Sequence, residues 1–367
     1  MSDILVENRE YKNILNQRQI MRLITRNTTA NCNPEIYAGY LLSDPIHATC
    51  TSLSHIMEGI SHDSVNRFLL RENYTPKDLL KDTEGTIDKV GGVISVDDMV
   101  LDKPYSNANK SELISYYYSG KHHDTVKGIN IITLYYTDTQ GVRVPINYRI
   151  IDPKDKKTKN ELFREMLKEV LDWGFKANYV TGDSWYSSKE NMKFITKYEI
   201  RFLFGIECNR IVSLKKGTWT QVQKIDDWNE NSVDGYFKDF GHVKLFRQAS
   251  KYSYRYYVIA RPINDNGMIC EETFKKVHLI HWNIEQFHRA TKQLSNIEKF
   301  QVRKTQAIST HIFCSYLSYI KLELARSKSL IVNWYQIKKE LFTDAIKKFI
   351  SSGIDQLEES NIAPELV

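Results

Sequence analysis

Apolar and polar positions follow two different periods along the chain. Residues 1 to about 85 have apolar positions at helical spacing and predict mostly helices. From Gly92 the pattern changes to short apolar strands, followed by alternating helices and strands, in the order β-β-β-α-β-α-β. The expected strands are 93–101, 128–137, 142–152, 177–183 and 201–207, and the expected helices are 159–175 and 187–199. This order predicts an α/β fold, a mixed sheet with helices on its faces.

Residues 209–262 interrupt that alternation. Four short segments with strand composition, separated by turn residues, predict a β-rich insertion there. After it the apolar positions return to helical spacing, which predicts helices over 278–292, 305–326 and 334–350. The last residues, EESNIAPELV, are typical of a frayed tail.

Within the N-terminal region, residues 52–70 predict two short helices around a turn at residues 59–61, with Ser61 or Asp63 as N-cap of the second. Two helices joined by a short turn are compatible with a helix-turn-helix, and also with a plain helical bundle. In a helix-turn-helix the second helix would present three polar side chains to DNA: Ser64, Asn66 and Arg67.

The helix over residues 278–292 has two chemically different faces. An apolar face, expected to contact the core, holds Leu279, Ile280, Ile284, Phe287, Ala290 and Leu294. The opposite face holds His278, His281, Glu285, His288, Arg289 and Lys292. Glu285 is a single acid among basic residues, which suits a group that binds a divalent cation while its neighbours hold phosphates. An ordinary solvated helix face is the alternative.

Composition narrows the class of protein. Lys and Arg outnumber Asp and Glu by 51 to 45 in 367 residues, a net charge of +6 that permits a nucleic-acid partner without requiring one. The five cysteines have no short paired spacing, so they predict neither a zinc site nor a disulfide framework and fit a reducing cytosol. No signal peptide or membrane span is expected, because no apolar stretch approaches about 20 residues.

Two expected strands lead into aspartate. Asp97 and Asp98 follow the apolar start of the first strand, and Asp183 ends the strand 177–183. If these strands are neighbours, the carboxylates converge where α/β proteins commonly build sites, and a shared divalent cation would relieve their repulsion. Oxygen ligands from separate elements favour Mg²⁺ or Mn²⁺ over zinc. A turn-forming role for each aspartate is the alternative.

Three segments, VISVDDMVL, VTGDSWY and HLIHWNIEQFHRATKQL, resemble the acidic motifs of DDE transposases from bacterial insertion sequences, a superfamily with a ribonuclease H-like core. The family's Y-(2)-R-(3)-E-(6)-K signature corresponds to His278, His281, Glu285 and Lys292, with His in place of Tyr and Arg. In the first motif, Met99 stands where the family usually has Ser or Thr, and Asp98 is an alternative to Asp97.

The resemblance implies a transposase that binds the ends of its own insertion sequence and cleaves and joins DNA by cut-and-paste transposition. It implies two Mg²⁺ or Mn²⁺ ions held by Asp97, Asp183 and Glu285. The implied partners are element ends and target DNA, with a homodimer on DNA and no membrane, in the bacterial cytoplasm at the nucleoid. The expected DNA contacts are His278, His281, Arg289, Lys292, Asn66, Arg67 and Trp219, with Trp219 or Trp228 as candidates to stack on a flipped base.

The expected division of the chain is a helical DNA-binding region (1–88), a first catalytic part (89–208), the β-rich insertion (209–262), a second catalytic part with the Glu285 helix (263–325) and a helical C-terminal region (326–367). Two other functions remain open: a metal-dependent nuclease of the same fold that never joins strands, and a non-catalytic DNA-binding relic.

Overall fold

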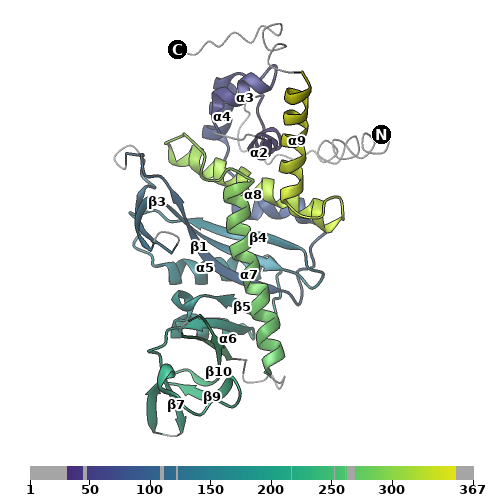
Figure 1. Ribbon diagram of the computed structural model, residues 1–367. Coiled ribbons are helices and arrows are strands. Elements are labelled where there is room, and N and C mark those ends of the chain that lie inside the picture. Colours follow the sequence, from purple (N-terminus) through teal and green to yellow (C-terminus); the bar gives the residue numbers. More distant parts are fainter. Residues whose placement is uncertain are drawn as a thin grey trace.

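A computed structural model describes residues 31–43, 48–107, 111–120, 123–215, 217–251, 253–260, 262 and 269–352 (Figure 1). The helices expected before residue 31 and the tail EESNIAPELV lie outside the described residues. The five cysteines all lie within them and are free thiols. No helix in these ranges is long and apolar enough to cross a bilayer.

The centre of the fold is a mixed sheet in which the expected strands are confirmed. Its core strands lie in the order β4-β3-β1-β5-β6, with β1 antiparallel to β3 and parallel to β5, and β5 parallel to β6. Their bounds are β1 Val93–Asp102, β3 Asp124–Thr137, β4 Arg143–Ile150, β5 Tyr179–Gly182 and β6 Arg201–Ile206. All four residues of β5 and most of β3 are buried, which is why these strands have continuous apolar runs.

One strand of this region was not expected. β2, Ser115–Ser119, pairs antiparallel with the first residues of β3 at the edge of the sheet. Its sequence SYYYS has no apolar alternation, and Tyr116 and Tyr118 are exposed. An edge strand that buries little side-chain surface leaves only a weak hydrophobic pattern in the sequence.

The β-rich insertion continues the same sheet beyond β6, in the order β6-β11-β10-β9-β7-β8. β11 pairs antiparallel with β6, so the last strand of the insertion is hydrogen-bonded directly to the catalytic part of the sheet. The bounds are β7 Ile211–Lys215, β8 Thr218–Gln221, β9 Ser232–Phe237, β10 Gly241–Ala249 and β11 Tyr254–Ala260. Figure 1 shows these strands at the lower end of the molecule.

Helices cover both faces of the sheet. On one face lie α5, Lys159–Asp172, and α6, Lys189–Lys197, which begin at the N-caps Thr158 and Ser188. On the other lie α7, Glu271–Gln293, and α8, Thr305–Ser327, which contact β1, β3 and β4. α7 crosses the sheet from Phe246 and Tyr257 in the insertion to Asp97 in β1, and it is the long green helix of Figure 1. One helix therefore links the insertion to β1.

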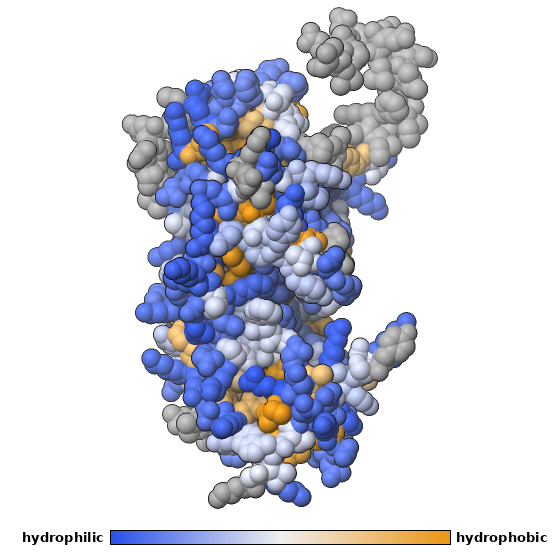
Figure 2. Space-filling view, turned by 90° about the vertical axis from the view of Figure 1, so that its left-hand side faces the viewer, coloured by the Kyte–Doolittle hydropathy of each residue, from blue (hydrophilic) through white to orange (hydrophobic). Residues whose placement is uncertain are grey.

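The helices at the upper end of Figure 1 are α2 Pro34–Ser43, α3 Cys50–Ile56, α4 His62–Arg71 and α9 Tyr335–Ser352, with a 3-10 helix η1 Pro76–Thr83 beneath them. Of these, α2, α4 and η1 pack on α8, whereas α3 packs on α4 and α9 on α2. The Tyr37 hydroxyl lies 2.9 Å from Nδ1 of the buried His311 in α8, a polar contact inside this packing. The surface turned to the viewer in Figure 2 is mainly hydrophilic, with apolar residues in small separate patches.

The expected α3–α4 pair is present, and its N-cap is Ser61, whose Oγ accepts from the backbone N–H of Ser64. The expectation that Ser64 faces DNA was wrong. Ser64 is buried, and its hydroxyl accepts hydrogen bonds from the N–H groups of Asn31 and Cys32. Among the expected DNA-facing residues of α4, Asn66 is exposed and Arg67 is half-buried.

Candidate active site

Asp97 and Asp183 are brought together by the register of two parallel strands. β1 and β5 pair from Val93 with Tyr179 to Val96 with Gly182, and one step further along the same register lie Asp97 and Asp183. Neighbouring strands are about 4.8 Å apart. Because side chains alternate along a strand, Asp183 has the same facing as Thr181, which bonds to Ser95 on the α7 side. Asp97 shares that face with Ser95.

The surroundings of Asp97 disfavour its charged form. Its Oδ1 accepts from the N–H of Asp98, and its Oδ2 lies 3.5 Å from Nδ1 of His288 on α7. Burial raises the pKa of Asp97 well above its usual range, and the charges of Asp98 and Asp183 raise it further. A cation placed between these carboxylates would oppose each of those effects.

Asp98 points to the opposite face, where protein groups already satisfy it. Its Oδ2 accepts from Nζ of Lys159 at 2.7 Å and from Nδ2 of Asn130 at 2.9 Å. Its Oδ1 accepts from the hydroxyl of Tyr186 at 3.2 Å. Both oxygens are engaged, so Asp98 is the structural acid of the pair and Asp97 the one that faces α7.

Asp183 is exposed at the end of β5 and caps the short 3-10 helix η3, Ser184–Tyr186. Its Oδ1 accepts from the N–H of Trp185 at 2.9 Å. Loss of hydration raises the pKa of Asp183, and the charge of Asp98 raises it further.

Glu285 approaches from α7 and is exposed. Loss of hydration raises its pKa, the cations Arg255 and Arg289 oppose that rise, and the charge of Asp183 adds to it. The charge of Asp183 therefore raises the pKa of both Asp97 and Glu285. Within the described ranges, no three His, Cys, Asp or Glu side chains are close enough to hold one metal ion together, so the acids are neighbours without a preformed ligand cage.

The histidines of α7 differ from the expected cationic face. His281 is half-buried, and its Nδ1 lies 3.1 Å from the hydroxyl of Thr181 beneath the helix. Burial lowers the pKa of His281 to about 4, and it also lowers the pKa of His278, whose ring packs against Tyr257 and Phe274. Both rings are neutral near pH 7. Their contact with DNA remains a prediction, and it would be made without a positive charge.

Two further expectations about α7 were wrong. Leu279, expected in the core, is 71% exposed, whereas His288, expected on the solvated face, is only 9% exposed. Burial lowers the pKa of His288 to about 3. Its Nε2 is buried and finds no hydrogen-bond partner among the residues that the structure describes. The cause is the crossing of α7 over the sheet, because different sides of a helix are covered at its two ends.

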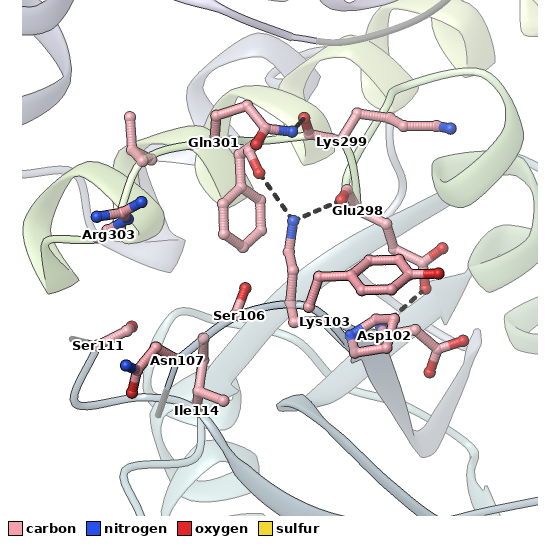
Figure 3. A pocket seen from close by; sticks show the side chains of 14 residues that line it. Asp102, Lys103, Ser106, Asn107, Ser111, Ile114, Glu298, Lys299, Gln301 and Arg303 are labelled. Atoms are coloured by element: carbon pink, nitrogen blue, oxygen red, sulfur yellow. Dashed lines mark hydrogen bonds between the residues drawn. The ribbon is translucent and has the colours of Figure 1, made fainter. Parts of the chain in front are cut away.

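Lys292 lies two turns beyond Glu285 and is already paired. Its Nζ donates to the carbonyl of Val100 at 2.7 Å and lies 2.6 Å from Oε1 of Glu298. Glu298 belongs to the loop after α7, which a second lysine holds: Nζ of Lys103 donates to the carbonyls of Glu298 and Phe300 (Figure 3). A pocket of about 370 Å³ opens beside this loop. The expected phosphate contact of Lys292 therefore requires a change of partner.

The remaining expected DNA contacts on α7 and in the insertion differ in their distance from the acids. Arg289 is exposed, one turn after Glu285 on α7. Trp219 on β8 is 43% exposed and meets Tyr236 edge to face, so its ring is accessible for stacking. Trp228 is half-buried, and its indole N–H donates to the carbonyl of Ile225, which makes it a packing residue of the insertion. Arg255 was not expected at the site, because nothing local in the sequence relates it to Glu285.

The solved structures that resemble this chain include two transposases. A piggyBac transposase in a synaptic complex with hairpin DNA shares the fold, with a TM-score of 0.50 and 15% identity over 97% of this chain and 81% of that chain. The Drosophila P element transposase in a strand transfer complex matches with a TM-score of 0.28 and 12% identity, over 60% of this chain and 54% of that one. No curated protein sequence matches.

The family model described as Transposase DDE domain matches residues 89–321. That span contains the register-paired aspartates, the insertion and Glu285 on α7, and it covers more than half of the chain. The chain therefore belongs to the DDE transposase domain family.

Proposed function

We propose that this protein is a transposase that binds the ends of its own bacterial insertion sequence, cleaves the DNA there and joins the freed ends to target DNA by cut-and-paste transposition. The observation that carries the proposal is the register of Asp97 with Asp183 on adjacent parallel strands, with Glu285 facing them from α7. Family membership supports it, as does the fold shared with a piggyBac transposase solved with hairpin DNA.

The acids suit two Mg²⁺ or Mn²⁺ ions. All three donors are carboxylates, and loss of hydration together with the charge of a nearby carboxylate raises the pKa of each. When bound, such ions activate an attacking hydroxyl and stabilise the leaving oxygen of a phosphoryl transfer. Asp97, Asp183 and Glu285 would hold them.

The other residues of the site would orient these acids and the DNA. His288 contacts Asp97, and Lys159 with Tyr186 keeps Asp98 on the far face. Arg289 and Lys292 extend the same face of α7 along the expected DNA path. We also propose that two copies act together, one at each element end, in the bacterial cytoplasm at the nucleoid.

The test separates three activities. A labelled duplex with the terminal inverted repeat that flanks the gene, ending in a 3′ hydroxyl, is incubated with target plasmid and Mg²⁺. A transposase yields labelled plasmid, a nuclease yields only shortened labelled fragments, and a DNA-binding relic yields neither product. Three single substitutions should each abolish the joined product: Asp97→Asn, Asp183→Asn and Glu285→Gln. Binding of the element end should remain, since the basic side chains that are expected to contact DNA are unchanged. Joining by Glu285→Gln at the wild-type rate would refute the proposal.

A further inference from the structure

The positive charge beside Glu285 does not come from the residue that the signature position indicates. His281 occupies the place of the family's Arg, one turn before Glu285, but its Nδ1 is directed inward to the hydroxyl of Thr181. Thr181 in turn donates to Oγ of Ser95, so its oxygen is free to accept from the imidazole. This chain of hydrogen bonds fixes the His281 ring against the sheet.

Arg255 reaches the site from the insertion. β11 is antiparallel to β6, and β6 is parallel to β5, so the start of β11 lies at the same end of the sheet as the end of β5. The registers place Gly182 level with Phe204, and Phe204 level with Val258. Arg255 precedes Val258 by three residues and therefore lies about 7 Å beyond the level of Asp183, two strands away.

The side chain of Arg255 points to the face that α7 covers. Arg255 is two residues before Tyr257 on β11, so the two side chains point to the same face of the sheet. The ring centroid of Tyr257 lies 4.7 Å from that of His278 on α7. Arg255 is exposed, so its guanidinium is open to a ligand, and a hydrogen bond with the Tyr257 hydroxyl helps to orient it. Its charge lowers the pKa of both Glu285 and His278, which places it near this face of the helix.

We propose that Arg255 binds the DNA phosphate next to Glu285, the phosphate that is cleaved or its immediate neighbour, and so supplies the cation that His281 lacks. A guanidinium can hold two phosphate oxygens at once, which fixes the phosphate in orientation as well as position. The inference rests on the proposed function, because that function brings a phosphate to Glu285. It assigns a role in catalysis to the insertion.

The experiment compares Arg255→Gln with Arg255→Lys and with a matched control, Arg247→Gln. Arg247 lies on the adjacent strand β10, opposite Tyr256 in the register, so it points to the other face of the sheet, over Trp228 and Tyr254. End binding is measured in EDTA at several salt concentrations with the inverted-repeat duplex. Cleavage is measured in Mg²⁺ under single-turnover conditions, and thermal unfolding confirms that each variant is folded.

Arg255→Gln should flatten the slope of log affinity against log salt by about one unit and weaken end binding about fivefold to tenfold at physiological salt. Cleavage of the bound duplex should fall by about a hundredfold or more, because charge that develops on the phosphate loses its partner. Arg255→Lys should keep the salt slope and lose part of the cleavage rate, since lysine keeps the charge but cannot hold two phosphate oxygens at once. Arg247→Gln should change neither the slope nor the rate.

Two duplexes, one with a neutral methylphosphonate at the cleaved position and one with it at the neighbouring position, identify the phosphate. One of them should bind wild-type protein more weakly than the unmodified duplex, whereas Arg255→Gln should bind it and the unmodified duplex equally. A wild-type salt slope and cleavage rate in Arg255→Gln would overturn the role of Arg255 while leaving the proposed function intact. A wild-type protein that binds the inverted repeat no better than a scrambled duplex would overturn both.

Discussion

Nδ1 of His288 lies 3.5 Å from Oδ2 of Asp97. The helix α7 therefore carries both the acid Glu285 and a side chain that contacts Asp97 on β1. The imidazole is almost fully buried, and burial keeps it neutral near pH 7. A neutral ring that donates through Nδ1 would hold Oδ2 of Asp97 in place, while the N–H of Asp98 already holds Oδ1. His288 would then act through Asp97, as a positioning residue.

His288→Leu and His288→Asn test this role. The asparagine amide keeps a donor near the position of Nδ1, whereas leucine removes it. We expect His288→Leu to raise the Mg²⁺ concentration needed for half-maximal cleavage about tenfold to a hundredfold, and His288→Asn to restore most of that loss. Unfolding temperature should barely fall in His288→Leu, because the buried Nε2 has no partner to lose. Equal Mg²⁺ dependence in all three proteins would show that the contact is only packing.

The two adjacent aspartates of β1 should respond in opposite ways. Asp97→Asn should abolish cleavage with little loss of stability, since it removes a charge that burial disfavours. Asp98→Asn should cost about 1–3 kcal/mol of stability, because it breaks the ion pair with Lys159, whose side chain is 25% exposed, beside Asp98 at 16%. Thermal unfolding and cleavage assays on the two variants check this. Normal cleavage by Asp97→Asn with loss in Asp98→Asn would exchange the two roles.

Metal-free stability should depend on pH through the three acids. Their pKa values are raised in the folded state, so the folded protein holds these protons more tightly than the unfolded chain. The resulting contribution is present below the unfolded pKa values of about 4 and is lost as pH rises through the folded ones. The triple variant Asp97→Asn, Asp183→Asn, Glu285→Gln should lack this loss and gain stability over wild type between pH 4 and pH 7 in denaturant titrations.

Divalent metal should reverse that loss in the wild type alone. At a Mg²⁺ concentration a hundred times its Kd, binding to the folded state should add about 2.7 kcal/mol of stability. The triple variant should show no such gain. Calorimetric unfolding at pH 7.5 with and without Mg²⁺ measures the difference, and an equal gain in both proteins would mean that the ion binds elsewhere.

Lys292 and Glu298 make a matched pair for DNA binding. Glu298 holds Nζ of Lys292 at 2.6 Å and competes with a phosphate for it, so Glu298→Gln should tighten end binding and leave the slope of its salt dependence nearly unchanged. Lys292→Ala should flatten that slope by about one unit, and Glu298→Gln should have no effect when Lys292 is absent. Salt titrations of the single and double variants measure this coupling.

Much of the fold could be predicted because its signals are local. The strands β1, β3 and β5 contain short apolar runs, and caps such as Ser61 and Ser188 stand next to the helices they begin. The acids were assigned because Asp97 and Asp183 follow apolar strand residues, and because Glu285 is a single acid among the basic residues of one helix face. The side chains that surround them were harder to assign, since burial of His288 and exposure of Leu279 depend on the path of α7 over the sheet. Arg255 is 30 residues before Glu285, and only the pairing of β11 with β6 relates them.

That pairing also bears on solubility. The strand β6, RFLFGI, would be an open sheet edge if β11 did not cover it, and such apolar edges readily recruit strands from other molecules. A shortened protein that joins residue 208 to residue 269 would keep all three acids yet expose the backbone groups of β6. We therefore expect it to precipitate as strand-paired aggregates, so a minimal catalytic domain cannot be obtained by trimming this region unless another strand or helix shields the edge.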